Sequence, residues 1–350
     1  MRTSVDSELY ISGAEVLLKG EFPKGRELFY ISYMAVLAVI TFIGFTPDVV
    51  IYIHFIAAVI AIFCTYQLAR KLTENSFIAL SAPLLYILWF KFQQWNLIVY
   101  TDALFSHMVV ISIYALTQSK KPSSKAGAYV LILFTSFLRP TGLGLLFSVI
   151  LYELSENLRA NSFSSKQKIE VSMLSIGLLL ISLNYILKDF IDSFINSYQA
   201  AEIIYPKIKL IIEKPEFLHI PEKNKQPLMR LMLFILYNPL YFFKISLVKG
   251  LLFLGHIKPY YSLMHNIFIG AFLYPLYFLA LKGYLFMKNG SLKTLLISFI
   301  MFQLLIVSFT SENWDGRFLL PILPLIFILA ANGISAYLQK DLLKDETFPR

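Results

Sequence analysis

Charged residues are scarce in this chain, and cysteine is nearly absent. Asp, Glu, Lys and Arg make up 15% of the 350 residues, whereas hydrophobic residues make up 57% and the mean hydropathy is +0.65. A water-soluble domain carries roughly 25% charged residues, so the deficit indicates a protein that lies in a lipid bilayer. The single cysteine, Cys64, stands inside an apolar run, which excludes an internal disulfide framework and a CxxC metal site.

Basic residues outnumber acidic residues in this chain. Lys and Arg number 31 against 22 Asp and Glu, a balance that could point to a nucleic-acid partner. Here, however, the basic residues form short clusters between apolar runs, which is the pattern that orients membrane proteins. We therefore expect a bilayer, and no nucleic acid, as the partner of this charge.

Apolar runs indicate an all-α, polytopic transmembrane protein with about nine spans. A helix needs roughly 20 residues to cross a ~30 Å hydrocarbon core. Runs close to this length occur at 48–69, 76–91, 103–118, 126–138, 141–157, 169–187, 262–282, 292–310 and 318–338. Two further apolar stretches, 29–45 and 230–255, are expected to be interfacial or juxtamembrane helices, although 29–45 could also cross.

Basic clusters predict which side each loop faces. The clusters, all expected on the cytoplasmic side, are Arg70–Lys71, Lys120–Lys121–Lys125, Arg159–Lys166–Lys168, Lys282–Lys288–Lys293 and Lys340–Lys344. The loops left outside are 92–102, 139–140, 188–261 and 311–317. Residues 230–255 then lie along the outer interface or re-enter, in keeping with their Asn-Pro break.

This topology divides the chain into four parts. We expect an extracytoplasmic acidic loop with a juxtamembrane helix over 1–47 and an N-terminal transmembrane module over 48–187. An extracytoplasmic loop with an interfacial helix occupies 188–261. The C-terminal transmembrane helices and a short cytoplasmic tail occupy 262–350.

Ionisable side chains gather at the expected outer ends of the spans. Asp102 lies in "VYTDALF", Arg139 in "FLRPTG", and Asp315 and Arg317 in "ENWDGRFLLP". Charge inside a bilayer is costly, so this grouping indicates a mixed acidic and basic site that is half sunk in the membrane and open to the outside. Each residue also has a purely structural interpretation: Asp102 as a helix N-cap, and the arginines as interfacial anchors that snorkel outwards.

The first residues of the chain are acidic and polar, whereas the later segments are largely apolar. The stretch "TSVDSELYISGAEVLLKGEFP", residues 3–23, contains Asp6, Glu8, Glu15 and Glu21. In one interpretation, Asp6 or Ser7 simply caps a helix that ends at Gly20. The five histidines, which are His54, His107, His219, His256 and His265, lack HxxxH or HxxE spacing, so we interpret them as packing or interface residues.

Several of these blocks together resemble the GT-C superfamily of integral-membrane glycosyltransferases. The likeness is to its bacterial branch of dolichyl-phosphate-mannose-protein mannosyltransferase-like and lipid A aminoarabinose transferase-like enzymes. "VDSELYISGAEVLLKGEFP" resembles the first outer loop of that branch, and "LFYISYMAVLAVITFIGFTPDVV" its juxtamembrane helix. "VYTDALFSHMVV" is similar to the second outer loop. "FLRPTGLGLL" and "GRFLLPILPLIFILAANGI" are similar to the mid-chain turn and the final helix.

The resemblance implies that a sugar moves from a polyprenyl-phosphate carrier to an acceptor on the outer face of a bacterial-type cytoplasmic membrane. The acceptor would be a glycan, a lipid or a protein. Members of the family normally have one more transmembrane helix before the acidic loop. This chain is therefore expected to lack that helix or to need an upstream segment for activity.

The resemblance also implies roles for particular residues. Asp6 is expected to accept the proton of the acceptor, with Glu8 as an alternative, and Tyr10 to contact the substrate. Arg139 and Arg317 are expected to hold the lipid phosphate. Asp102 is expected to orient a sugar hydroxyl or an arginine. Lys24 and Arg26 are further candidates for contacts with the phosphate.

Other interpretations stay open at this point. Some branches of the superfamily use paired acidic residues with a divalent cation, which the "DSE" spacing allows, but no third ligand is fixed by the sequence and we assign no cofactor. A polytopic transporter or lipid flippase, a polysaccharide polymerase or ligase, and a truncated inactive relative are the competing functions.

Overall fold

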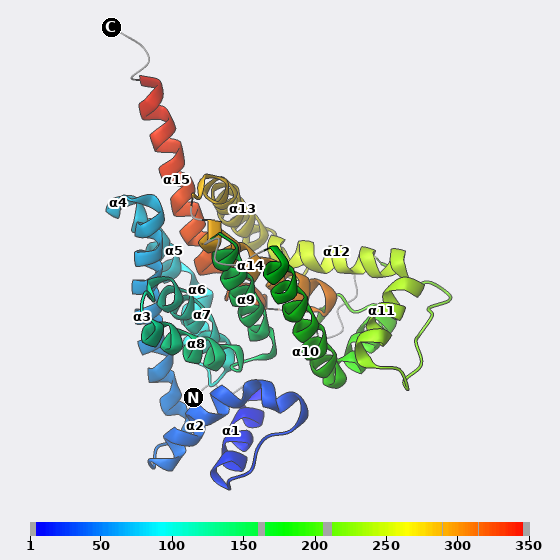
Figure 1. Ribbon diagram of the computed structural model, residues 1–350. Coiled ribbons are helices and arrows are strands. Elements are labelled where there is room, and N and C mark those ends of the chain that lie inside the picture. Colours follow the sequence, from blue (N-terminus) through cyan, green and yellow to red (C-terminus); the bar gives the residue numbers. More distant parts are fainter. Residues whose placement is uncertain (1–4, 160–164, 206–211, 289, 314, 346–350) are drawn as a thin grey trace.

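The computed structural model describes residues 5–159, 165–205, 212–288, 290–313 and 315–345, and its regular structure is almost entirely helical (Figure 1). The α-helices are α1 (Val5–Leu18), α2 (Ile31–Phe42), α3 (Val50–Thr73), α4 (Ser76–Ala79), α5 (Ser81–Leu88), α6 (Phe90–Asn96), α7 (Thr101–Gln118), α8 (Pro122–Ser136), α9 (Leu143–Arg159), α10 (Ser165–Gln199), α11 (Pro227–Tyr237), α12 (Pro239–Gly255), α13 (Leu263–Phe286), α14 (Gly290–Phe309) and α15 (Leu323–Asp345). The predicted all-α class is confirmed.

Short 3₁₀ turns and one small bridge connect these helices. The turns are η1 (Gly25–Tyr30), η2 (Pro47–Val49), η3 (Pro140–Gly142) and η4 (Arg317–Leu319). Strand β1 (Ile204–Tyr205) pairs in parallel with β2 (Glu312–Asn313), with Ile204 opposite Glu312. The bridge ties the loop after α10 to the segment that leads into η4.

Fewer helices than predicted are both long and apolar enough to cross a membrane. Within the described ranges four qualify: Gly25–Phe42, Pro47–Thr73, Leu263–Phe286 and Gly290–Phe309. Two bent pairs, Ser76–Leu88 with Phe90–Asn96 and Pro227–Tyr237 with Pro239–Gly255, would raise this number to six. The remaining predicted spans correspond to helices that are shorter or that carry more polar residues.

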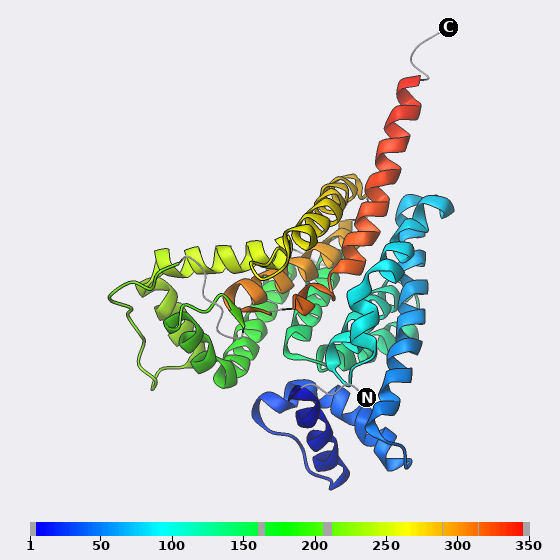
Figure 2. The same ribbon diagram turned by 180° about the vertical axis from the view of Figure 1, so that it is seen from behind.

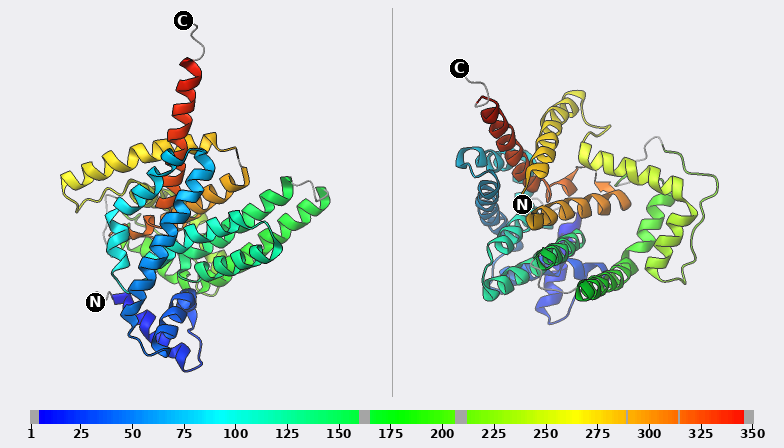
Figure 3. Two further views of the ribbon diagram at one scale, coloured as in Figure 1. Left: turned by 90° about the vertical axis from the view of Figure 1, so that its left-hand side faces the viewer. Right: turned by 45° about the horizontal axis from the view of Figure 1, so that its top comes forward.

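The helices form a main bundle with a second lobe at its side. In Figures 1 and 2, α1 and α2 lie at the end of the bundle where α3 begins, and the C-terminal end of α15 lies at the opposite end. Helices α9 and α10 run beside each other (Figure 3). The second lobe, built from α10, α11 and α12, has its own apolar core around Phe194, Tyr198, Phe234 and Phe242. The domain boundary expected at 188 therefore falls inside α10, because the C-terminal half of this helix packs into that core.

The Asn-Pro step in the 230–255 stretch breaks a helix, as the sequence suggests. α11 and α12 meet there at 102°. The amide of Asn238 holds the corner: its Nδ2 donates to the carbonyl oxygen of His219 at 2.7 Å, and its Oδ1 accepts from the His219 N–H at 3.0 Å. α12 consequently runs across the direction of α3 and α15 (Figure 1).

Apolar side chains cover the outside of the bundle, which is the arrangement expected of a protein surrounded by lipid. On α3, Tyr52, Ile56, Val59 and Phe63 succeed one another at helical spacing and are all more than half exposed. A continuous apolar stripe of this kind has no place on a protein surface in water. The structure thus supports a membrane-embedded protein.

Two histidines lie inside the bundle in a connected set of hydrogen bonds. His107 Nε2 bonds to Asn96 Oδ1 at 2.7 Å, and Tyr86 Oη bonds to His107 Nδ1 at 2.6 Å. His54 Nδ1 contacts the Asn96 carbonyl oxygen at 3.2 Å, and its Nε2 contacts Tyr33 Oη at 3.3 Å. Each ring can donate once and accept once, so both are satisfied as neutral imidazoles. This network fixes α6 against α3 and α7, and it places these two histidines in the core.

Two glycines let α13 and α15 cross at close range. A Cβ atom on Gly283 would overlap the carbonyl oxygen of Leu329, and a Cβ on Gly333 would overlap that of Leu279. Asn332 Nδ2 also donates to the Gly283 carbonyl oxygen at 2.7 Å. Small residues at such crossings are typical of helix pairs inside membranes, where close backbone contact replaces the hydrophobic effect.

We expect Gly283→Ala to destabilise the protein by roughly 1–3 kcal/mol, because the added methyl group forces the two backbones apart. Gly270→Ala is the matched control on the same helix, since a Cβ there meets only the Tyr274 ring at 3.7 Å. Thermal unfolding of the detergent-solubilised variants measures both effects. Equal melting temperatures for the two variants would contradict the close crossing.

Candidate functional site

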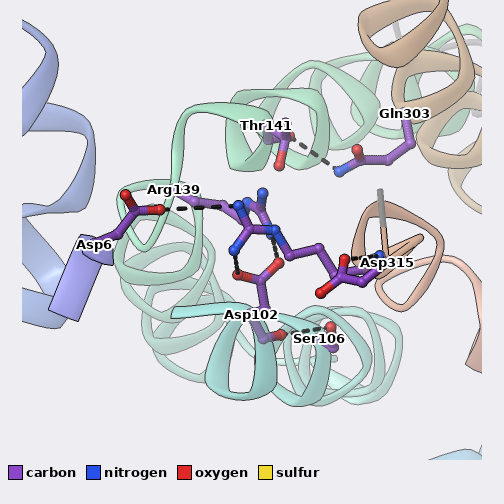
Figure 4. A network of polar contacts seen from close by, with 8 residues as sticks. Asp6, Asp102, Ser106, Arg139, Thr141, Gln303 and Asp315 are labelled. Carbon is purple, nitrogen blue, oxygen red and sulfur yellow. Dashed lines mark hydrogen bonds and ion pairs between the residues drawn. The ribbon is translucent and has the colours of Figure 1, made fainter. Parts of the chain in front are cut away.

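Helix α1 brings Asp6 to the end of the bundle. Asp6 lies in the first turn of α1, and the neighbouring Ser7 is fully buried, donating from Oγ to the carbonyl oxygen of Val99 at 2.8 Å. This bond ties the start of α1 to the loop before α7. The Asp6 side chain is 47% exposed and points at the guanidinium groups shown in Figure 4.

Asp102 and Arg139 form a buried ion pair at the centre of the site. Asp102, in the first turn of α7, has a side chain that is 1% exposed, and Arg139 stands between α8 and η3, immediately before Pro140. Arg139 Nη1 donates to Asp102 Oδ1 (Figure 4). The guanidinium also lies over the rings of Phe318, at 5.1 Å, and Phe105, at 5.7 Å. A charge so far from water needs this kind of partner to remain ionised.

Arg317 connects the two carboxylates. Its Nη2 lies 3.9 Å from Asp6 Oδ2, and its Nη1 lies 3.8 Å from Asp102 Oδ2. Burial opposes its charge, but Asp102 and then Asp315 raise the pKa of Arg317 above its ordinary value. The side chain therefore stays a cation although only 14% of it is exposed.

Aromatic rings hold Arg317 in place. Its guanidinium carbon lies 4.7 Å from the ring centroid of Tyr100 and 5.5 Å from that of Trp95. Tyr100 in turn packs edge-on against Tyr10, with centroids 5.4 Å apart. Cations over aromatic faces gain roughly 0.5–2 kcal/mol, more where water is excluded. The rings thus orient Arg317 without neutralising it.

Glycine and carboxylate geometry shape the turn that carries Arg317. Gly316 has φ +69°, and a Cβ there would overlap the ring of His256. The Arg317 N–H donates to Asp315 Oδ1 at 3.1 Å. Nearby, Gln303 Nε2 donates to the Thr141 carbonyl oxygen at 3.2 Å and joins α14 to the turn after Arg139 (Figure 4).

The structure brings together some of the candidate residues and separates others. Asp6, Asp102, Arg139 and Arg317 form one connected cluster, with Tyr10 buried in the adjoining aromatic packing. In contrast, Glu8, Lys24 and Arg26 are exposed.

Arg26 has a different set of partners from the one considered from the sequence. Its Nε donates to the Asp189 carbonyl oxygen at 2.6 Å, its Nη2 donates to Ser193 Oγ at 2.7 Å, and its guanidinium lies over Phe190. Each of these groups belongs to α10. Arg26 thereby fastens the loop after α1 to that helix.

The ring contacts of Trp95 and Tyr100 are a part of the site that sequence reasoning did not foresee. Tyr100 stands two residues before Asp102 in "VYTDALF", so its proximity to the acidic residue was a usable signal. Trp95 offers no comparable pattern, because its contact with Arg317 depends on how α6 is tilted against α7.

Asp315 should make the protein more stable at acidic than at neutral pH. Burial raises the pKa of its carboxyl, which Arg317 lowers only in part. The folded state therefore binds this proton more tightly than the unfolded state does. The resulting stabilisation is complete below the unfolded pKa of about 3.9 and is lost as pH rises through the folded pKa. We therefore expect Asp315→Asn to be more stable than the wild type at pH 7, with the difference vanishing towards pH 3.5. Melting temperatures across pH 3.5–7 measure this, and a difference that is constant with pH would contradict it.

A resident metal ion finds few ligands at this site. Among the described residues, no three His, Cys, Asp or Glu side chains converge as a metal centre requires. Asp6 and Asp102 approach each other only through the arginines. The arginines and the exposed Asp6 carboxylate offer hydrogen-bond donors and an acceptor to a polar organic group.

Two properties of the cluster define its chemistry. One carboxylate, that of Asp6, is accessible from solvent, whereas the other charges are buried and mutually paired. Counting Asp315, three carboxylates face two arginines, so the cluster itself has no excess of positive charge.

Comparison with known proteins gives no further guidance: no family model, no curated protein and no solved structure matches the chain.

Proposed function

We propose that this protein is a membrane glycosyltransferase that moves a sugar from a polyprenyl-phosphate donor to an acceptor. The observation that carries the proposal is the position of Asp6, a half-exposed carboxylate beside two buried arginines that are held by a second carboxylate. An accessible base next to fixed cations is the combination that such a transfer needs.

The reaction would proceed by direct displacement at the anomeric carbon. Asp6 accepts the proton of the acceptor hydroxyl as its oxygen bonds to the anomeric carbon. The bond between that carbon and the phosphate oxygen breaks, and its electron pair leaves with the phosphate. Arg317, held between Asp6 and Asp102, is placed to stabilise the charge that develops.

Asp102 and Arg139 serve as the rigid base of the site in this proposal. Asp102 holds Arg139 directly and Arg317 at 3.8 Å, so it orients both cations. Such fixed charges stabilise a transition state because they need not reorganise as the reaction occurs.

The predicted nine-span topology and GT-C-like architecture belong to the same proposal. The acidic first loop, the buried Asp102 and the Arg317 turn would face the extracytoplasmic side of a bacterial-type cytoplasmic membrane. The bent pair of α11 and α12 would lie along the outer interface, which agrees with the direction of α12 across the bundle.

The location of the charges favours this function over a transporter. A transport pathway typically has ionisable groups near the middle of the spans. Here Asp6, Asp102, Arg139 and Arg317 all lie at helix starts, helix ends or turns.

Sugar transfer in proteoliposomes tests the proposal. The purified protein would be offered labelled polyprenyl-phosphate sugars and a mixed acceptor extract, with a known enzyme confirming that each donor is usable. Transfer that depends on Asp6 supports the assignment. No transfer from any usable donor, with or without an added upstream helix, would overturn it.

A further inference from the structure

A group of two lysines and a histidine lies at the Gly316 turn, outside the carboxylate–arginine cluster. It consists of Lys91 in α6 together with His256 and Lys258 in the loop between α12 and α13. The His256 ring packs directly against Gly316, one residue from Arg317. This group is therefore continuous with the candidate site, although none of its members belongs to the carboxylate–arginine cluster.

Hydrogen bonds hold the loop that carries His256 and Lys258 in place. His256 adopts the left-handed conformation, with φ +55°, as the cap of α12. The Lys258 N–H donates to Asn266 Oδ1 at 3.1 Å, and Asn266 Nδ2 donates back to the Lys258 carbonyl oxygen at 3.0 Å. Lys258 itself is 0% exposed. Lysine side chains are rarely buried to this degree, so the loop holds a cation where little water reaches it.

The electrostatic field in this group is positive. Burial first, and then the charges of Lys258 and Lys91, lower the pKa of His256 to about 3. The charge of Lys91 also acts on the carboxylate of Asp315, which accepts a hydrogen bond from the Arg317 backbone N–H. The charges of Lys258 and Lys91 thus act on the same imidazole, that of His256.

Two buried polar atoms in the same place make no hydrogen bond to any described residue. They are His256 Nδ1 and Trp89 Nε1, and the two rings lie 6.4 Å apart. An indole nitrogen can only donate, and an imidazole nitrogen can donate in one tautomer. Buried donors of this kind normally have partners, so a hydrogen-bond acceptor from outside the chain would complete them.

A line of aromatic rings leads from this group to the outside of the bundle. Trp89 packs against Phe272 with centroids 5.6 Å apart, and Phe272 stacks on Phe268 at 6.2 Å. Phe268 is 67% exposed on α13, one of the helices that are long and apolar enough to span a membrane. The polar group is thereby connected to a surface suited to a hydrocarbon chain.

We infer that Lys91, His256 and Lys258, together with Trp89, form a binding subsite for the phosphate group of a lipid phosphate whose hydrocarbon chain runs along Phe272 and Phe268. The lysines supply charge, and the two ring nitrogens donate to phosphate oxygens. The inference deepens the proposed function and rests on it for the identity of the lipid. It adds two lysines beside a site whose arginines lie against carboxylates.

Binding, rather than transfer, tests the subsite. The full chain in phosphatidylcholine nanodiscs would be titrated with dodecyl phosphate by calorimetry. Inorganic phosphate, and nanodiscs containing phosphatidylglycerol, would form the other two arms. We expect dodecyl phosphate to bind more tightly than inorganic phosphate and to keep its affinity when phosphatidylglycerol is present.

Variants identify the residues that bind. Lys91→Gln and Lys258→Met should each weaken dodecyl phosphate binding about tenfold or more, because each removes a charge-assisted hydrogen bond. Lys91→Arg should restore most of the affinity. Lys120→Gln, at an exposed lysine after α7, is the control and should bind as the wild type does. Because Lys91 is only partly buried, its substitution keeps the test decisive even if Lys258→Met fails to fold.

Several outcomes would overturn the inference. Undiminished binding in Lys91→Gln would do so, as would an absence of binding to the wild type. Equal affinity for inorganic phosphate, or loss of dodecyl phosphate binding in the presence of phosphatidylglycerol, would overturn the lipid-phosphate assignment. If the lysine-dependent binding is found but no sugar is transferred, the subsite stands and the proposed function fails. If Lys91→Gln transfers sugar as well as the wild type does, the proposed function stands and the subsite fails.

Discussion

Replacing Asp6 by Asn is expected to slow sugar transfer at least about a hundredfold while the protein stays folded. General-base catalysis typically contributes 10²–10⁴-fold, and an amide of the same shape cannot accept the proton of the acceptor. The fold should tolerate the change because the Asp6 side chain is 47% exposed and the Arg317 guanidinium is 3.9 Å away. Initial rates with a labelled donor in proteoliposomes provide the measurement.

The control for Asp6 lies on the same helix. Glu15 is an exposed carboxylate of α1 with no place in the cluster, so Glu15→Gln changes the charge of α1 equally. This variant should transfer sugar at the wild-type rate. Wild-type turnover in Asp6→Asn would show that Asp6 is not the base.

Replacing Arg139 by Ala should destabilise the protein by roughly 3–5 kcal/mol, the usual effect of removing one partner of a buried ion pair. Asp102 would remain in place, 1% exposed, with Arg317 at 3.8 Å as its remaining cation. The Phe105 and Phe318 rings would also lose the guanidinium that packs on them. Chemical and thermal unfolding in detergent measure the loss.

Two comparisons separate the ion pair from a general effect of losing an arginine. Arg70→Ala removes an exposed arginine at the end of α3 and should change stability by no more than about 0.5 kcal/mol. The double variant Asp102→Asn with Arg139→Gln removes both charges and should be more stable than Arg139→Ala. A single variant as stable as Arg70→Ala would mean that the pair contributes nothing to the fold.

Local patterns were enough to select the residues of the cluster. Asp102, Arg139 and Arg317 stand out because each interrupts or borders an apolar run, and charge in such positions is costly. The choice between Asp6 and Glu8 was also accessible in principle. Two residues on a helix are about 200° apart, so the two carboxylates of α1 face opposite ways.

The pairing of these residues, and the number of long apolar helices, depended on tertiary packing. Arg26 bonds to α10, more than 160 residues further along the chain, which no local pattern reveals. The run at 76–91 is broken at Trp89, where the chain turns by 53° between α5 and α6. α7 carries buried polar groups, Asp102 and His107, that lower its overall hydropathy. The helix bounds set by the fold thus differ from the apolar runs, and some of the resulting helices are too short or too polar to qualify as spans.

The ion pairs of the site also set an order of events during synthesis. Asp6 and Asp102 leave the ribosome well before Arg317, which must arrive before the two carboxylates share a cation. At 5–20 residues per second, the interval between Asp102 and Arg317 is on the order of ten to forty seconds. Once Arg139 has been synthesised, it is the one cation of the cluster available to Asp102 until Arg317 follows, so the polar centre is completed only when the η4 turn docks.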